Sequence, residues 1–120
     1  MEETVENVTK FKEENLQAVY QGMYLVTNGS HGTLRTAFND LPVKVAAKTG
    51  TAEEDKNRSS HTWFVCFAPF DDPQIAITVM IPFGEGSGTP APAVAKAIIR
   101  EYLGLDYTPT NTTMQTVLAE

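Results

Sequence analysis

Two apolar runs that are rich in β-forming residues and are joined by a short link constrain the fold of this chain more than any other feature. Residues 62–69 and 75–83 are dense in Val, Ile, Phe and Trp, and the Phe-Asp-Asp-Pro between them is typical of a hairpin connection. A third candidate strand, residues 43–52, precedes them, followed by a charged, turn-rich insert at residues 54–60. Because sequential strands with short links pair antiparallel, the sequence predicts a three-stranded antiparallel meander.

A helix is predicted before this sheet. Residues 13–27 place apolar side chains at three- and four-residue steps, which is one face of an amphipathic helix, and the helix should stop at Asn28-Gly29. A loop, residues 30–42, then leads to the first strand. The expected apolar face consists of Leu16, Val19, Tyr20, Met23 and Val26.

A second helix is predicted after the sheet. It follows the glycine-rich stretch 84–88, has Pro90 and Pro92 near its first turn, where missing amide donors are tolerated, and ends at Gly104. Its expected apolar face consists of Ala93, Val94, Ala97, Ile98, Tyr102 and Leu103. Residues 13–104 are therefore expected to form one α+β unit, between a polar linker at residues 1–12 and a polar, threonine-rich tail at residues 105–120.

Both faces of the predicted sheet are apolar. Side chains alternate along a strand, so Trp63, Val65 and Phe67 point one way, and Phe64, Cys66 and Ala68 point the other way. Two helices are too few to cover both faces of such a sheet. We therefore expect a piece of a larger fold, in which the sheet lies between layers of helices.

Composition restricts the function. A chain of 120 residues with 42% hydrophobic residues can bury one modest core. A net charge of -6, with nine basic residues spread thinly, argues against nucleic acid or an anionic membrane as a partner. No apolar run is long enough to cross a membrane, so we expect a soluble chain without a membrane segment. The single cysteine, Cys66, excludes an internal disulfide and a cysteine-rich metal site, and a buried, inert thiol is expected.

The candidate site is the sequence Lys48-Thr49-Gly50-Thr51, at the end of the first predicted strand. A lysine on a strand edge can hold or move a proton, threonines supply hydroxyl donors, and a glycine lets another backbone approach closely. By alternation Thr49 faces away from Lys48 and Gly50, and Thr51 reaches the Lys48 side only if Gly50 allows a bulge or twist. The stretch itself contains no strong nucleophile.

The surrounding sequence strengthens this interpretation. Gln21-Gly-Met23 lies on the first predicted helix, Gly32-Thr33 follows it, and the stretch Ser60-His-Thr-Trp63 opens the second strand. Together with Lys48-Thr49-Gly50, this ordered set resembles the C-terminal part of the transpeptidase domain of class B penicillin-binding proteins, roughly over residues 13–104.

The family's attacking serine lies in a Ser-x-x-Lys element, and a second element reads Ser-x-Asn. Neither occurs in these 120 residues. The nearest imitation is Thr9-Lys-Phe-Lys12, whose threonine is a poor candidate for a nucleophile. The resemblance therefore implies the last third of a catalytic domain, with its serine outside this chain.

The resemblance implies a peptidoglycan D,D-transpeptidase. Such an enzyme cross-links D-Ala-D-Ala stem peptides through an acyl-serine intermediate, is acylated by β-lactams, needs no cofactor, and acts at the extracytoplasmic face of the cell membrane, with its anchor outside this chain. The implied partners are the stem peptide, β-lactams and the remainder of the domain. Lys48 and Thr51 are the implied catalytic residues, Lys48 for charge and proton relay, Thr51 for the donor carboxylate and the oxyanion hole. Thr49 and Gly50 join them in substrate binding.

Other interpretations stay open. The fold would also suit a β-lactamase or a β-lactam sensor, or a non-catalytic module that binds an extended peptide at the sheet edge. Lys48 would then be a solvated strand lysine, and Thr49 a packing residue. Trp63 is expected in the core, and His61 is expected to be a surface or capping histidine. Two histidines without ligand-like spacing predict no metal site.

Residues 86–91 fit the dinucleotide fingerprint G-x-G-x-x-A. That fingerprint needs a parallel βαβ unit, and no strand is predicted after the second helix, so a flexible loop is the preferred interpretation.

Overall fold

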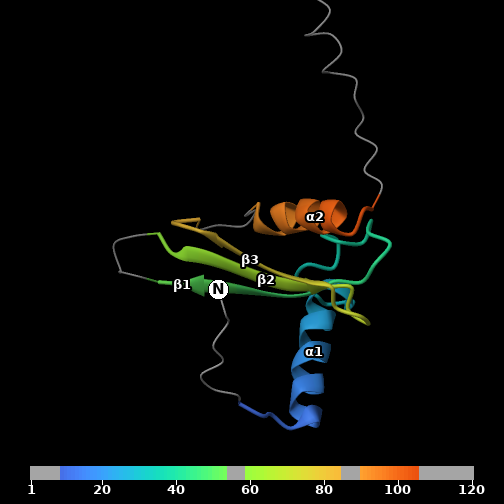
Figure 1. Cartoon of the computed structure of the whole chain (residues 1–120). Helices are drawn as coiled ribbons and strands as arrows, with labels where there is room; N and C mark the ends of the chain where they lie inside the picture. The colour runs from blue at the N-terminus through green and yellow to red at the C-terminus, as the bar shows by residue number, and fades with distance from the viewer. Residues whose placement is uncertain (1–8, 54–58, 85–89, 106–120) are drawn as a thin grey trace, which may run out of the picture.

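The computed structural model describes residues 9–53, 59–84 and 90–105. The predicted α+β architecture is confirmed: a helix, a three-stranded antiparallel sheet and a second helix follow one another along the chain (Figure 1). The elements are α1 (Glu13–Asn28), β1 (Ala46–Ala52), β2 (His61–Ala68), β3 (Ile75–Ile81) and α2 (Ala91–Tyr102). Four predicted features lie wholly or mainly outside the described residues, namely the linker, the charged insert, the glycine-rich stretch and the tail.

The sheet is the predicted meander, with strand order β1-β2-β3 and antiparallel pairing throughout. The prediction of the start of β1 at residue 43 is wrong, because the ladder begins with the pair Ala46 and Phe67. The two carbonyls just before that point accept hydrogen bonds from groups outside the ladder. The Lys44 carbonyl accepts from the amide of Phe70, and the Val45 carbonyl accepts from side chains of α1.

The hydrophobic core lies between the sheet and α2, which packs on β2 and β3 (Figure 1). From α2 it receives Ala91, Ala95 and Ile99, each fully buried. The predicted apolar face of α2 is therefore wrong, since Val94 and Ile98 are exposed. Almost every position of this helix except Lys96, Arg100 and Glu101 is apolar, so periodicity could not identify the face. The small alanines allow α2 to approach the sheet closely.

The loop between α1 and β1 crosses to the α2 side of the sheet. Phe38 stacks on Phe64 with ring centroids 6.2 Å apart, and both rings are buried. Asp40 joins the same loop to α2 through two ion pairs, 2.8 Å to the Lys96 ammonium and 2.7 Å to the Arg100 guanidinium. The loop thus closes the core at one end of the sheet.

Helix α1 lies on the opposite side of the sheet and points away from it, with only its C-terminal half in contact (Figure 1). Tyr20 packs edge-on against Phe67, with centroids 5.6 Å apart. Much of the predicted apolar face of α1 is uncovered, and Val19 is 58% exposed. The helix ends where predicted, at Gly29, where a Cβ would lie 2.6 Å from the Leu25 carbonyl oxygen.

The rest of that sheet face is open within the described chain. Trp63, Val65 and Met80 are 42%, 36% and 44% exposed, although all three are large and apolar. The expectation that Trp63 lies in the core is wrong for this chain, because α1 covers only the end of the face near Ala46 and Phe67. The name "open face" is used below for the surface formed by Lys48, Gly50, Trp63, Val65, Thr78 and Met80, which the strand registers place together.

Candidate functional site

The four candidate residues lie on β1, the edge strand of the sheet, and all are exposed. The ladder to β2 is regular along them: Lys48 pairs with Val65, Thr49 with Phe64, Gly50 with Trp63 and Thr51 with Thr62. A bulge at Gly50 is therefore absent from this ladder, and the register does not bring Thr51 to the Lys48 side. Lys48 and Gly50 share the open face, and Thr49 and Thr51 share the other face.

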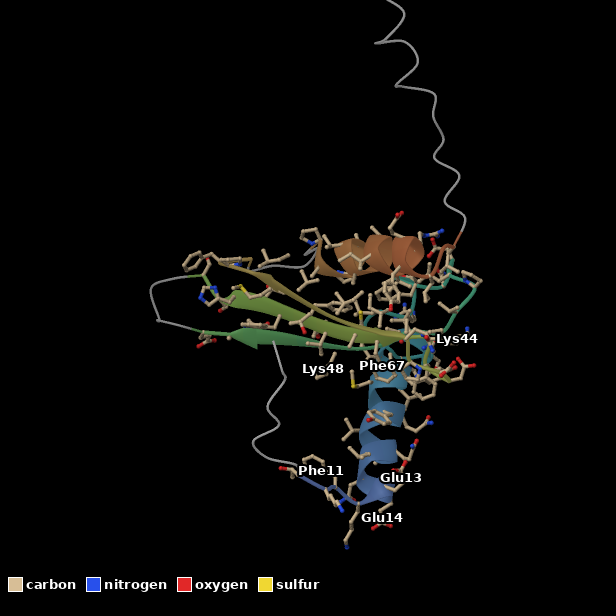
Figure 2. The ribbon with its side chains drawn as sticks, in the orientation of Figure 1. Phe11, Glu13, Glu14, Lys44, Lys48 and Phe67 are labelled. Carbon is tan, nitrogen blue, oxygen red and sulfur yellow. The ribbon has the colours of Figure 1, made fainter. Side chains whose placement is uncertain are left out.

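The side chain of Lys48 projects from the α1 side of the sheet, as does that of Phe67 (Figure 2). Its ammonium group donates a hydrogen bond to the backbone carbonyl of Thr49. Within the described part of the chain Lys48 has no carboxylate partner. Its positive charge is thus available at the edge of the sheet for an anion or a reacting group.

Gly50 has no steric reason to be glycine within the described chain. A Cβ at this position would meet only the Cβ of Trp63, at the ordinary contact distance of 3.6 Å, and φ lies outside the left-handed region. A glycine inside a strand costs stability, and it is expected where another backbone comes close. No described segment of the chain makes such an approach to Gly50.

The strand next to the site is tightly packed. Ala47 is fully buried and pairs with Cys66, which is 3% exposed. Burial raises the pKa of the Cys66 thiol to about 12, so the thiol stays protonated and inert at neutral pH, as predicted. Both residues serve packing here.

The start of β1 is held by two residues that the sequence did not mark as functional. The amide of Asn28 donates to the Val45 carbonyl at 2.9 Å, and the hydroxyl of Thr27 also contacts that carbonyl. Thr27 is 4% exposed. In the sequence, Thr-Asn before a glycine indicated only the end of a helix. A polar pair at a helix end facing a strand start is a signal that could have identified them.

His61 is the first residue of β2 and lies at the far end of the site. Its Nδ1 accepts a hydrogen bond of 3.2 Å from the amide of Phe83, and the two rings are 4.8 Å apart. It therefore closes the turn after β3, which agrees with a capping role.

The described residues contain neither a metal-binding cluster nor a membrane-spanning helix. No group of three or more His, Cys, Asp or Glu side chains there is arranged to hold a metal ion. None of the described helices is long and apolar enough to span a membrane.

Comparison with known proteins places these features in a family. The model of the penicillin-binding protein transpeptidase domain matches residues 1–100. The peptidoglycan D,D-transpeptidase MrdA of Haemophilus influenzae is 34% identical over 101 aligned residues, and the match covers 72% of this chain and 16% of that protein. The chain thus spans a small part of the length of this relative.

Solved structures agree with this match. Penicillin-binding protein 2B of Streptococcus pneumoniae superposes with a TM-score of 0.72 and 32% identity, over 90% of this chain and 18% of that one. PBP2 of Pseudomonas aeruginosa, solved in complex with WCK 5153, gives a TM-score of 0.69 and 38% identity, over 82% of this chain and 21% of that one. Since a family model covers most of the chain and the fold agrees, the chain belongs to the penicillin-binding protein transpeptidase-domain family.

Proposed function

We propose that this chain forms the Lys-Thr-Gly part of a peptidoglycan D,D-transpeptidase whose attacking serine lies outside these 120 residues. The serine attacks the carbonyl of the penultimate D-alanine of a stem peptide, and the terminal D-alanine leaves. An amine of a second stem peptide then takes the acyl group and releases the serine. A β-lactam acylates the same serine. The reaction takes place at the extracytoplasmic face of the cell membrane.

In this reaction the residues of β1 bind and polarise the donor peptide. Lys48 lies beside the serine, where its charge stabilises the anionic substrate and its ammonium group takes part in proton relay. The hydroxyls of Thr49 and Thr51 share one face, and that of Thr51 binds the donor carboxylate. The amide of Thr51 contributes to the oxyanion hole. Gly50 leaves room for the donor backbone.

The single observation that carries this proposal is the exposed, regular edge strand that presents Lys48 and Gly50. Nothing in the described chain requires a glycine at position 50, and no carboxylate among the described residues neutralises Lys48. A ligand with a carboxylate and an extended backbone would explain both features, because the carboxylate would pair with Lys48 and the backbone would lie against Gly50. The large side chains of the same open face, Trp63, Val65 and Met80, are apolar, which fits docking of the remainder of the domain.

The direct test labels envelopes of the source cells with fluorescent penicillin and isolates the protein with an antibody against this chain. We expect a labelled band far above 13.1 kDa, the mass of the chain. The isolated 120-residue chain should gain no mass on incubation with penicillin, because it lacks the serine. A stoichiometric adduct on the isolated chain would contradict the proposal.

An alternative function is the binding of an extended peptide by strand addition, without catalysis. It is favoured by the same edge position of β1, which leaves one side of the strand unpaired among the described residues. An unlabelled band near 13.1 kDa in the same experiment would support it. The names of the relatives, transpeptidases and penicillin-binding proteins, do not favour a β-lactamase or a sensor.

A further inference from the structure

The carbonyl groups that lead into β1 are held from two sides. The Lys44 carbonyl accepts a 2.8 Å hydrogen bond from the amide of Phe70, in the turn between β2 and β3. The next carbonyl, that of Val45, accepts from the side chains of Asn28 and Thr27 at the C-terminal end of α1. Val45 is 1% exposed, so water does not replace these donors easily. The strand that carries Lys48 starts one residue later.

Each described partner of the Asn28 side-chain nitrogen, Nδ2, is a hydrogen-bond acceptor. This nitrogen is 2.9 Å from the Val45 carbonyl oxygen, 3.1 Å from the Tyr24 carbonyl oxygen and 2.9 Å from the Thr27 hydroxyl oxygen. The Thr27 hydroxyl, in turn, is 3.2 Å from the Tyr24 carbonyl oxygen and also contacts that of Val45. Two carbonyl oxygens, one from the end of α1 and one from the start of β1, are thus bridged by these two side chains. Without these donors the Val45 carbonyl, which precedes the ladder, would lose its described hydrogen-bond partners, whereas the Tyr24 carbonyl keeps the backbone bond of the helix.

We propose that Asn28, with Thr27, is a positioning residue for the Lys48-Thr49-Gly50-Thr51 site, acting by fixing the start of β1 against α1. The expected effect on acylation rests on the proposed function, whereas the expected effect on the position of β1 rests on geometry alone. β1 is an edge strand paired with β2 on one side, so its N-terminal end depends on other contacts to fix its position. Lys48 is the third residue after Val45, whose carbonyl is bridged. A shift there would move the lysine relative to a serine held by another part of the domain.

Two variants of Asn28 and two of Thr27 separate this role from general packing. Asn28→Ala removes the side-chain donor. Asn28→Asp keeps the shape of the side chain but replaces the donor with an oxygen that faces two carbonyl oxygens. Thr27→Val keeps the volume and removes the hydroxyl, and Thr27→Ser restores it. Asn15→Asp and Asn15→Ala are the matched controls for Asn28→Asp and Asn28→Ala, since Asn15 is an exposed asparagine of the same helix.

The first measurement is amide hydrogen exchange of the natural-length protein that carries this chain, followed by peptide mass spectrometry. We expect Asn28→Asp, Asn28→Ala and Thr27→Val to speed exchange about tenfold in peptides of residues 43–52, with peptides of β3 and α2 unchanged. Thr27→Ser and both Asn15 variants should match the wild type. Equal acceleration in all peptides, or none in β1, would overturn the proposal.

The second measurement is the rate of acylation of the same proteins by fluorescent penicillin, well below their unfolding temperatures. We expect the three disruptive variants to react about tenfold or more slowly, and Thr27→Ser to react at the wild-type rate. Wild-type rates in all variants would overturn the positioning role. If the wild-type protein itself takes no label, the proposed function fails, and the exchange pattern still decides whether Asn28 fixes β1.

Discussion

Gly50 lies directly across the β1–β2 ladder from Trp63, so the smallest residue of the candidate site faces the largest side chain of the sheet. The indole is 42% exposed and does not press on the glycine, because a Cβ there would fit at 3.6 Å from the Trp63 Cβ. The glycine and the tryptophan together shape a flat, partly apolar surface beside Lys48. This surface is suited to a second backbone laid along β1.

Replacing Gly50 by alanine should separate stability from function. We expect Gly50→Ala to leave the protein as stable or to stabilise it by about 0.5 to 1 kcal/mol, because alanine restricts the unfolded chain and meets no clash. Acylation by penicillin should fall about tenfold or more, because the new methyl group occupies space needed by the donor. Urea denaturation and fluorescent-penicillin kinetics of the natural-length protein measure the two effects.

The matched control is Gly22→Ala in α1, where a Cβ would meet no atom within 4 Å. It should stabilise the helix by about 1 kcal/mol and leave acylation unchanged. Wild-type acylation by Gly50→Ala would show that the glycine does not make room for a ligand.

Lys48→Ala should reduce acylation about 10²- to 10⁴-fold with little change in stability. Lys48 is exposed, and among the described residues its ammonium group bonds to the neighbouring carbonyl of Thr49, so its loss leaves no buried group there unpaired. Lys44→Ala is the control, since Lys44 is an exposed lysine of the chain leading to the same strand. If both variants were acylated at similar rates, Lys48 would be a solvated strand lysine.

The order and type of the elements could be predicted because local signals agreed with one another. Helical periodicity over residues 13–27 and the strand pair around residues 70–73 each pointed to a single structure. The resemblance rested on short sequences at fixed places along these elements, and the family model then matched the same stretch.

The failures arise where the decisive partner is distant in sequence or not part of the described chain. Periodicity could not orient α2, because apolar side chains lie on most of its circumference. Trp63 was expected in the core, since a large aromatic is usually buried, but the layer that would cover it is not in the described chain. Asn28 was taken as a helix stop, because its partner, the Val45 carbonyl, lies 17 residues further on.

Val65→Lys should have little effect on the isolated chain and a destabilising effect on the natural-length protein. In the isolated chain Val65 lies on the open face and is 36% exposed, so a lysine there should change stability by less than about 0.5 kcal/mol. In the natural-length protein the remainder of the domain is expected to cover this face, and a buried unpaired lysine should cost several kcal/mol. Circular dichroism of the isolated chain and the soluble yield of the natural-length protein measure the two effects.

The control for this comparison is Gln74→Lys, in the turn before β3, where the side chain is exposed. It should be neutral in both forms. If Val65→Lys were equally harmless in both, the open face would not be covered by the remainder of the domain, and the isolated chain would be expected to unfold as a clean, monomeric two-state unit.

Asp40 should make the attachment of the loop to α2 depend on pH. The hydrogen bond from Lys96 has the largest effect on the pKa of this carboxyl, and together with the bond from Arg100 it holds the pKa below its ordinary value of 3.8, although desolvation by burial opposes them. A lowered pKa in the folded state means that the ion pairs contribute fully above the ordinary value and are lost as the pH falls through the folded value. Asp40 is 49% exposed, so the contribution is at most about 1 kcal/mol.

Asp40→Asn should therefore lower the unfolding temperature at pH 6 to a small extent, and the difference from the wild type should shrink as the pH falls below about 4. Added salt should also reduce the difference, because exposed ion pairs are screened. Asp71→Asn is the control, since Asp71 is an exposed aspartate that forms no ion pair with the described residues. A difference for Asp40→Asn that stays constant from pH 6 to pH 3 would mean that the carboxylate charge does not hold this loop, and that the packing of Phe38 on Phe64 holds it instead.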